Sequence, residues 1–477
     1  MRSAVVLGLV ASIVAASSAD AAITLIARGT LGGVSDLSGL SGPLENGMAK
    51  NTLGGIGSGL AYAGGNTFLA VPDRGPNALA YNPAVDNTTS YISRFHTLDM
   101  ALTASGPGEA LPFTLTPTLT DTTLLYSAAP LAYGTGTGLG LPSGAPTENA
   151  AGVNYFTGRS DNYGAGGPGA PADARFDPES IRVSNDGKSV FISDEYGPYV
   201  RQFDRATGEL VRTFDLPANL AIGAPAPTEA GELAANTFGR TTNKGMEGLA
   251  ITPDGKTLVG VMQAALIQDK KPAKSLVRIV TIDVETGATK EYAYKLTTGS
   301  GVSEILALND HEFIVDERDG AGLGDGSAAV VKQFFKIDVA GAADVTGLAG
   351  AAALAAAVPK SAAPILDLVA ALGLNGIGPT LVPAKIEGIA FGQDVDLNGQ
   401  LLHTLYVSND NDFVDGVAGP NQFFVFGFQD GDLPGFQAQQ FQAVPEPASW
   451  ALLILGFGGV GAAVRRRRAV APRPYGA

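Results

Sequence analysis

The sequence predicts an all-β protein folded as a single β-propeller, and three observations support this prediction. Glycine (63 residues) and proline (29 residues) are frequent in the 477-residue chain, which favours turns over long helices. Short apolar alternations, several of them joined by Asp-Gly turns, follow one another along the chain. One hairpin pattern recurs five times. A closed ring of such hairpins would bury a core within one domain of this length.

The repeated unit is a strand, a tight turn and a second strand, with acidic residues near both outer ends. The two most similar copies cover residues 179–195 and 247–263, and each has Asp-Gly-Lys at its turn. Further copies begin at Glu304 and Glu387, and a copy without glutamate begins at Ser58. The spacing of the copies is too uneven for a WD40-type array but is typical of a loosely repeated propeller.

The interval between the copies at Ser58 and Glu179 is long enough for one more blade, which we expect around residues 113–125. The sequence therefore predicts six blades, with seven as the alternative number and a stacked β-sandwich as the alternative architecture. Residues 133–171 are rich in Gly, Pro and Ala and predict a long loop. Residues 341–374 are rich in Ala and Leu and predict a short helical insertion on the outside.

The charge balance excludes one class of partner and favours another. The chain has 46 acidic residues against 31 Lys and Arg residues, a formal net charge of −15. Because nucleic-acid binders carry an excess of basic residues, we expect no nucleic-acid partner. An acidic protein suits a cationic partner such as a metal ion. The chain contains no cysteine, so no disulfide contributes to its stability.

Both ends of the chain carry targeting patterns. Residues 1–21 combine Arg2, an apolar stretch over 4–16 and the small-residue site Ala19-Asp20-Ala21, which is typical of a secretory signal peptide. Near the other end, Pro-Glu-Pro at 445–447 precedes an apolar stretch over 451–464 and four arginines. Fourteen apolar residues reach about 21 Å along a helix, short of the ~30 Å hydrocarbon core. The arginines would hold this end on the cytoplasmic side.

The C-terminal pattern resembles the PEP-CTERM sorting signal of Gram-negative bacteria. The resemblance implies cleavage near residues 445–447 by an exosortase during export, after a transient membrane association through the C-terminal segment. The exported protein would then lie in the periplasm, on the outer cell surface or outside the cell. A permanent tail anchor is the alternative. The expected domains are a signal peptide (1–21), the propeller (22–435), a linker (436–444), the sorting signal (445–468) and a tail (469–477).

Several enzyme classes are excluded by the motifs that they require. The sequence has no Gly-x-Ser-x-Gly, no P-loop and no His-Glu-x-x-His. Its three histidines, His96, His311 and His403, are too scattered along the chain for a zinc cluster. Carboxylates are therefore the candidate functional groups.

The first set of candidate carboxylates lies at corresponding positions of four hairpins, which a propeller would bring to one mouth of its central channel. These residues are Glu179, Glu247, Glu304 and Glu387. Like charges at close range need a cation or large pKa shifts. An oxygen-rich, histidine-poor cluster favours Ca²⁺ over transition metals. The alternative is that each glutamate caps backbone amides and fixes the packing of its blade.

A second set of candidate metal ligands ends the partner strands of the hairpins. These residues are Asp73, Asp194, Asp316 and Asp410, and the same ends also carry Glu195, Glu317, Asp412 and Asp415, some of which must be simple turn residues. In addition, Asp394 and Asp396 have the spacing of the first half of an EF-hand calcium loop, although its twelfth position is Leu405 rather than Glu. A solvated hairpin turn explains this last pattern equally well.

Basic residues stand close to both acidic sets. Lys244 and Lys385 precede two of the glutamates, while Arg74 and Arg318 follow or lie near acids of the partner strands. Mixed acidic and basic clusters suit the binding of a phosphate through calcium and arginine together. Surface salt bridges are the alternative interpretation.

Six short words within residues 25–430 resemble the phytase-like domain family, which is labelled "esterase-like activity of phytase". The words occupy residues 71–75 (VPDRG), 176–181 (FDPESI), 193–197 (SDEYG), 244–249 (KGMEGL), 385–389 (KIEGI) and 407–413 (VSNDNDF). The resemblance implies a propeller fold and the hydrolysis of phosphoesters or esters.

We therefore expect an exported phytase-like hydrolase that acts on a small phosphate- or ester-bearing substrate with the help of calcium. The candidate catalytic residues are Glu179, Glu247, Glu387, Arg74 and Arg318. Calcium would bind the phosphate and lower the pKa of an attacking water, and the arginines would balance the charge of the transition state. Two alternatives stand beside this expectation: a non-catalytic, calcium-stiffened propeller that binds a surface or matrix, and a lactonase-like metal-dependent esterase.

Overall fold

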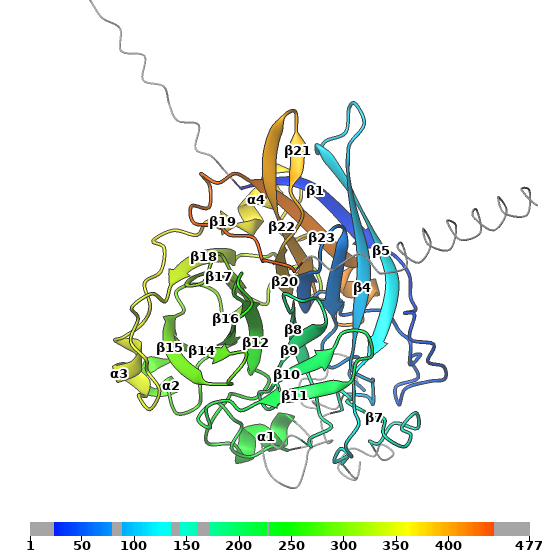
Figure 1. The fold of residues 1–477 in the computed structure, drawn as a ribbon, viewed down its shortest axis with the longest axis vertical. Helices are drawn as coiled ribbons and strands as arrows, with labels where there is room; N and C mark the ends of the chain where they lie inside the picture. The colour runs from blue at the N-terminus through cyan, green and yellow to red at the C-terminus, as the bar shows by residue number, and fades with distance from the viewer. Residues whose placement is uncertain (1–22, 79–87, 135–143, 160–171, 227–228, 443–477) are drawn as a thin grey trace, which may run out of the picture.

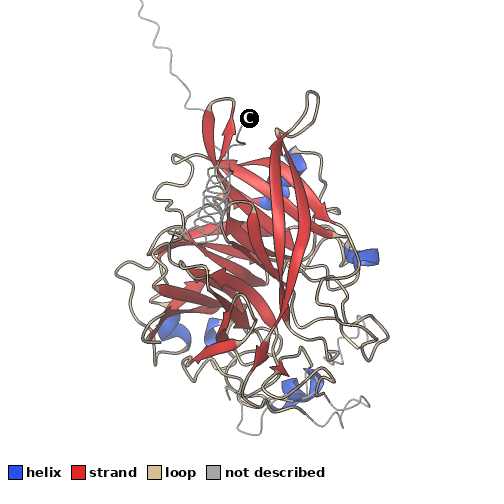
Figure 2. Ribbon diagram, turned by 45° about the vertical axis from the view of Figure 1, so that its right-hand side comes forward, coloured by secondary structure: helices blue, strands red, loops and turns tan. Residues whose placement is uncertain are grey.

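Strands dominate the computed structural model, which describes residues 23–78, 88–134, 144–159, 172–226 and 229–442. Figure 2 shows these strands in red, with a few short helices in blue at the edges. None of the helices in these ranges is long and apolar enough to cross a membrane. The predicted signal peptide, sorting signal and tail lie outside the described residues.

Five antiparallel sheets form the blades, four of them with four strands and one with an additional short strand (Figure 1). The first contains β2 (Gly59–Tyr62), β3 (Thr67–Val71), β4 (Arg94–Ala104) and β5 (Phe113–Leu124). The second contains β8 (Pro178–Val183), β9 (Ser189–Asp194), β10 (Val200–Asp204) and β11 (Leu210–Phe214). The third contains β12 (Met246–Ile251), β13 (Thr257–Met262), β14 (Leu276–Asp283) and β15 (Thr289–Lys295). The fourth contains β16 (Gly301–Ala307), β17 (Glu312–Arg318), β18 (Lys332–Asp338) and β19 (Leu366–Asp367).

The fifth blade joins the two ends of the propeller. It contains β20 (Ile386–Phe391), β22 (Gln400–Asn409), β23 (Asn421–Phe428) and, as its outer strand, β1 (Thr24–Leu31), while the short β21 (Val395–Leu397) pairs with β22. Figure 1 shows the N-terminal strand β1 beside the late strand β23. The first strand of each blade contacts its counterparts in the two neighbouring blades, so β2, β8, β12, β16 and β20 form a closed ring. The protein is therefore an all-β propeller, as the sequence predicts.

The predicted number of blades is wrong, because the described residues form five blades and not six or seven. Each of the five recurring hairpins is the inner pair of strands of one blade. Residues 113–125, where we expected another blade, instead supply β5, the outer strand of the first blade. The remaining described part of this interval contributes only a two-stranded sheet of β6 (Tyr126–Ser127) and β7 (Asn154–Tyr155).

A narrow ring of inner strands accounts for the low blade number. An added Cβ would lie 2.7 Å from the Ser180 Cα at Gly59, and 2.8 Å from the Glu304 Cα at Gly248. Neighbouring inner strands thus approach one another backbone to backbone, which only glycine permits at these positions. Apolar side chains between neighbouring blades, such as Leu69 of β3 and Ile192 of β9, form the core.

The helices lie in connections between or within blades. They are α1 (Glu229–Ala235), α2 (Lys270–Ala273), α3 (Gly350–Leu354), α4 (Leu368–Leu374) and α5 (Asp415–Ala418). The insertion predicted over 341–374 contains α3 and α4, as its composition indicates. Of the long loop predicted over 133–171, residues 135–143 and 160–171 lie outside the described residues.

Candidate functional site

Three glutamates reach one mouth of the channel because each lies in a β-bulge at the start of an inner strand. Glu247 falls in the register shift between Met246 and Gly248, and Glu179 and Glu387 lie in the corresponding shifts of β8 and β20. A bulge leaves the extra residue out of the ladder and redirects its side chain. The carboxylates of Glu179, Glu247 and Glu387 are close enough to raise one another's pKa.

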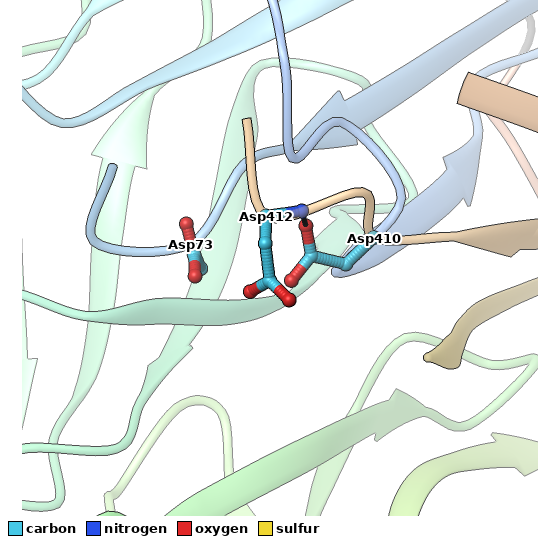
Figure 3. A group of neighbouring side chains, drawn as sticks. All are labelled: Asp73, Asp410 and Asp412. Carbon is cyan, nitrogen blue, oxygen red and sulfur yellow. Dashed lines mark hydrogen bonds between the residues drawn. The ribbon is translucent and has the colours of Figure 1, made fainter. Parts of the chain in front are cut away.

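Acids from the strand ends complete this acidic mouth. The oxygens of Asp177, Glu179 and Glu195 form one group within 4.8 Å, and those of Asp73, Asp410 and Asp412 form a second. Figure 3 shows the second group, in which the Asp412 amide donates a 2.7 Å hydrogen bond to Asp410 Oδ1. We use the term "acidic mouth" for the eight carboxylates of Asp73, Asp177, Glu179, Glu195, Glu247, Glu387, Asp410 and Asp412.

Arg318 lies between two of the inner-strand glutamates. Its Nη2 is 2.5 Å from Glu387 Oε1 and 3.3 Å from Glu247 Oε1. Gln263 Nε2 donates a further 2.6 Å hydrogen bond to Glu247 Oε1 and its own Oε1 accepts from Lys244 Nζ at 2.8 Å. The predicted catalytic residues Glu247, Glu387 and Arg318 are thus brought into direct contact.

The other two cations each join a group of strand-end acids. Arg74 Nη1 is 3.1 Å from Asp177 Oδ2 and 3.8 Å from Glu195 Oε2. Lys385 Nζ is 2.8 Å from Asp410 Oδ2 and 2.5 Å from Asp412 Oδ1. Each group of acids therefore has one basic partner within ion-pair distance.

The acidic mouth nevertheless holds more carboxylates than the nearby cations can pair. Eight carboxylates face the four cations Arg74, Lys244, Arg318 and Lys385, an excess of four negative charges when all are ionised. Glu247 Oε2 and Glu387 Oε2 are buried without a hydrogen-bond partner. In the described part of the chain, the Glu179 carboxylate has neither a hydrogen bond nor an ion pair, although the residue is only 7% exposed.

Burial and mutual repulsion raise the pKa of six of these acids: Asp73, Asp177, Glu179, Glu247, Glu387 and Asp410. Burial, followed by the charges of Asp177 and Glu247, raises the pKa of Glu179 well above its ordinary value. Burial raises the pKa of Glu387 to about 7 against the opposing effect of Arg318, and that of Asp177 to about 7 against Arg74. A cation bound among these oxygens would favour the ionised forms and relieve the repulsion.

A strained turn presents Asp412 to its neighbours. Asp412 (φ +52°) and Phe413 (φ +58°) both adopt the left-handed conformation, which is uncommon for residues other than glycine. The Phe413 ring packs so closely on Gly54 and Gly55 that an added Cβ on either would lie within 2.8 Å of it. This contact holds the turn in its strained conformation, and strained backbone of this kind is common at functional sites.

Glu304 does not belong to the acidic mouth, which corrects its prediction as a metal ligand beside the other three glutamates. In β16 the register shift falls on Ser303, and Glu304 pairs with Asp316. Glu304 therefore has the ladder position that Gly248 has in β12, where Gly248 pairs with Val261. Its side chain instead accepts from the Leu249 and Ile305 amides and from the Ser180 hydroxyl. Arg182 Nη2 lies 3.0 Å from its Oε2.

The pair of Arg182 and Glu304 lies on the propeller axis, and we name it the axis pair. Arg182 also donates to the carbonyls of Leu60 and Ile305, so the two side chains together contact the inner strands of four blades. Both residues are buried. The axis pair therefore bridges inner strands one ladder position further along than the bulged glutamates.

Two further predicted metal ligands, Asp194 and Asp316, lie outside the two groups of acids that share an ion-sized space. Both oxygens of Asp194 accept backbone hydrogen bonds, from the amides of Asp177 (2.8 Å) and Gly197 (2.6 Å). Asp316 Oδ2 accepts from the Ser303 hydroxyl at 2.9 Å, and its Oδ1 is buried without a partner. Burial raises the pKa of Asp194 to about 6 and that of Asp316 to about 7. Asp194 is a structural cap, and Asp316 belongs to neither of the two groups of carboxylates that lie within 4.8 Å of one another.

The predicted EF-hand-like ligands Asp394 and Asp396 lie at the opposite end of the fifth blade. They follow the far end of β20, and residues 395–402 form a tight hairpin of β21 and β22. Asp394 Oδ1 is 2.8 Å from His403 Nδ1, and Asp396 Oδ1 accepts from the Gly399 amide. The alternative of a solvated hairpin turn therefore describes this segment.

One acid of the mouth, Asp177, was in neither candidate set. It comes two residues before Glu179 within Phe-Asp-Pro-Glu. Extending the first set by two residues before each hairpin would have found it. Glu195 and Asp412 belong to the second acidic set, although they were not predicted as metal ligands.

Comparison with known proteins gives a family for most of the chain. The family model described as "Esterase-like activity of phytase" (Phytase-like) matches residues 51–413. A second model, the PEP-CTERM protein-sorting motif, matches residues 443–468, which indicates export and sorting by an exosortase.

One curated relative comes from the fungus Arthroderma benhamiae and is described as an uncharacterized secreted protein. It is 28% identical over 322 residues, which cover 56% of this chain and 60% of the relative. Solved structures with partial similarity include hydrazine synthase of Kuenenia stuttgartiensis (12% identity, 77% and 80% of the two chains, TM-score 0.32). A 6-phosphogluconolactonase candidate from Bacteroides uniformis is 15% identical over 81% and 93% of the two chains (TM-score 0.28).

Proposed function

Because the chain belongs to the phytase-like family, we propose that it is an exported hydrolase that cleaves a small phosphomonoester or ester at the acidic mouth with the help of calcium. The observation that carries this proposal is the convergence of eight carboxylates on four cations at one end of the channel. Strongly shifted, buried titratable groups in one cleft are a common mark of a functional site.

The residues of the acidic mouth fit calcium. All of the acids offer oxygen ligands, and the three histidines belong to β4, β22 and the turn before β17, away from the mouth. The unpartnered oxygens of Glu247 and Glu387, and the unpaired carboxylate of Glu179, are the strongest candidates for ligands. Bound calcium would supply positive charge for an anionic substrate and would lower the pKa of a coordinated water.

The chain's own cations suit the binding of an anionic group. Arg318 projects between Glu247 and Glu387, and Arg74 stands beside Asp177, so each could turn one donor towards a phosphate or carboxylate oxygen. The raised pKa of Glu179 favours its protonated form while no cation is bound, and a bound calcium ion would favour its ionised form as a ligand.

Assays with matched variants test the hydrolase proposal. We expect the purified protein to hydrolyse a model phosphomonoester, a model ester or both in calcium and to lose this activity in chelator. Glu247→Gln should reduce turnover at least tenfold with little change in folding. Asp396→Asn, which changes an exposed acid at the far end of the fifth blade, should keep full activity. An absence of hydrolysis of either substrate with calcium, magnesium or zinc would contradict the proposal.

A non-catalytic propeller that binds a surface or matrix is the second candidate function. The observation that favours it is the direct ion pairing of Arg318 with two glutamates, which also stabilises a purely structural mouth. This candidate predicts that calcium stabilises the protein without hydrolysis. A lactonase-like esterase with one central ion would instead hydrolyse esters or lactones and leave phosphomonoesters intact.

The sorting motif extends the proposal to the location of the protein. In a Gram-negative host, the C-terminal apolar stretch would enter the inner membrane transiently before cleavage near residues 445–447. We expect an intact-mass measurement on the exported protein to show that residues 1–21 and those beyond about 447 have been removed. Retention of the four arginines at 465–468 would contradict this processing.

A further inference from the structure

The last ten described residues cross the propeller face opposite the acidic mouth. This strap, residues 433–442, was expected to belong largely to a linker, yet it is tied to the blades throughout. The amides of Gln437, Gln440 and Gln442 donate hydrogen bonds of 2.7–2.9 Å to the carbonyls of Leu308, Pro253 and Asn185. Figure 1 shows the strap in orange, crossing the propeller towards β8.

Aromatic and side-chain contacts extend the strap to all five blades. Phe436 packs on Phe391, with ring centroids 4.5 Å apart, and Phe441 packs edge-on to Tyr62 at 5.8 Å. Gln439 Nε2 donates to the Val183 carbonyl at 2.7 Å. The strap residues that face the blades are thus fixed by both backbone and side-chain contacts.

The strap and the acidic mouth lie at opposite ends of the inner strands. The strap contacts residues at or just beyond the ends of β2, β8, β12, β16 and β20. The glutamates of the mouth lie at the starts of β8, β12 and β20. A strand of six residues is about 20 Å long, so the thickness of the propeller separates the two faces.

The sorting motif begins at the residue after the strap, and this limits where the membrane can be. The apolar stretch starts at Ala451, nine residues after Gln442. Whatever their conformation, nine residues span at most about 32 Å. The strap also contains no charged residue, whereas the acidic mouth has an excess of four carboxylates. Anionic lipid headgroups would repel the mouth and also the exposed acids Asp394 and Asp430 on the strap face, so the short connection from the strap, and not charge, sets the orientation.

We propose that, before cleavage, the strap face of the propeller lies against the lipid surface and the acidic mouth points away from it. The inference rests on the transient membrane insertion included in the proposed function, but not on calcium or catalysis. The strap acts as a rigid extension of the propeller. A tail anchored in the membrane would therefore hold the propeller in one orientation relative to the lipid surface. The mouth would then be open to solvent substrates while the protein is still attached.

Single cysteines can report this orientation, because the chain has none of its own. Lys256→Cys lies in the turn after β12 on the strap face, where the lysine side chain is 79% exposed. Val417→Cys lies in α5 beside the acidic mouth, where the valine is 54% exposed. Each variant of the full-length, uncleaved protein would carry a donor fluorophore and be reconstituted in vesicles of phosphatidylethanolamine and phosphatidylglycerol with an acceptor lipid.

We expect energy transfer to the lipid to be at least twofold more efficient from position 256 than from position 417. Insertion of thirty Gly and Ser residues between Gln442 and Ala443 should make the two efficiencies equal, because it releases the propeller from the membrane without altering its fold. Equal or reversed efficiencies in the protein without the insertion would contradict the orientation alone. No transfer from either position would contradict the membrane insertion and the orientation together.

Discussion

The axis pair and the acidic mouth both contain buried glutamates. These glutamates lie one ladder position apart but in opposite environments. Glu304 has a partner for every strong acceptor position: two amides, a hydroxyl and the Arg182 guanidinium. Glu179, which is almost as deeply buried, has neither a hydrogen bond nor an ion pair in the described residues. Burial alone therefore does not distinguish a structural from a functional carboxylate; the supply of donors does.

This difference has an energetic meaning. A buried charge with all of its partners contributes to a unique packing, and the removal of one partner leaves the other charge uncompensated. A buried carboxylate without partners costs free energy in the fold and is retained where an added ligand can offset that cost. The two regions should therefore respond in opposite ways to mutation and to calcium.

Loss of Arg182 should be the most damaging change. Arg182→Met would leave Glu304 unpaired on the axis, and we expect it to lower the free energy of unfolding by about 3–5 kcal/mol. Urea unfolding in chelator would measure this loss. The double variant Arg182→Met/Glu304→Gln should recover part of it, whereas Glu179→Gln should change stability by less than about 1 kcal/mol. An Arg182→Met protein as stable as the Glu179→Gln protein would remove the distinction between the two regions.

Calcium should stabilise the protein through the acidic mouth alone, and this should be the second largest effect on stability. At a calcium concentration of about one hundred times its Kd, linkage predicts a stabilisation of about 2.7 kcal/mol. We expect thermal unfolding to shift upwards in calcium, less in zinc, and only slightly for Glu247→Gln or Glu387→Gln. The Arg182→Met protein should keep its calcium response. If chelator leaves the melting temperature unchanged, the glutamates are blade-packing residues and both functional candidates lose their metal.

The propeller could be predicted from sequence because its inner hairpins carry the strongest local signals. The Asp-Gly turns at 186–187 and 254–255 occur as expected, with Gly187 and Gly255 at positive φ. The blade number could not be obtained in the same way. Outer strands such as β5 lack the motif, and the last blade takes β1 from the other end of the chain. Counting hairpins alone gives the correct five.

The sequence predicted the main residues of the acidic mouth but not the strand register that places Glu304 outside it. Glu179, Glu247 and Glu387 converge because their bulges are equivalent, whereas Glu304 resembles them only in sequence. The residue after Glu247 and Glu387 is glycine and the residue after Glu179 is serine, while the residue after Glu304 is the bulky isoleucine. A small residue at this position permits the close approach of inner strands, so the isoleucine was a physical sign that Glu304 itself occupies the position of the small residue.

The pH dependence of stability should also report on the acidic mouth, provided that a variant of Glu387 is compared, because burial raises the pKa of Glu304 in the axis pair to about 7 as well. The pKa of Glu387 is raised to about 7, so the folded protein holds this proton more tightly than the unfolded chain does. The stabilisation that it provides is therefore present at acidic pH, near the ordinary carboxyl pKa, and is lost as the pH rises through about 7. Each pKa unit corresponds to about 1.4 kcal/mol.

We expect unfolding in chelator between pH 5 and pH 8 to show this loss in the unmodified protein and a smaller loss in Glu387→Gln. Calcium should reverse the trend, because it binds the ionised carboxylates and its affinity rises with pH. Parallel pH profiles for the two proteins would show that Glu387 is not the titrating group.

The smallest expected effect lies on the strap face, where His403 offers a control that calcium should not touch. Burial lowers the pKa of His403, but hydrogen bonds to Asp394 (2.8 Å) and Asp430 (2.9 Å) outweigh burial and raise it overall. The stabilisation by protonated His403 is therefore complete below about pH 6.5 and is lost as the pH rises through its raised pKa. Because Asp430 is almost fully exposed, the pair should contribute less than about 1 kcal/mol.

The His403 ring also packs on Phe436 of the strap, at a centroid distance of 4.8 Å, so its deprotonation should loosen the strap before it affects the blades. We expect hydrogen exchange at the amides of Gln437 and Gln440, corrected for the intrinsic pH dependence, to become a few-fold faster between pH 6 and pH 8. His403→Gln should show the faster exchange at both pH values. Calcium should not restore the protection, because it binds at the other face, whereas it should restore the stability that the acidic mouth loses over the same range. A calcium-dependent recovery of strap protection would mean that the two faces are coupled through the axis pair, and the separation between them would fail.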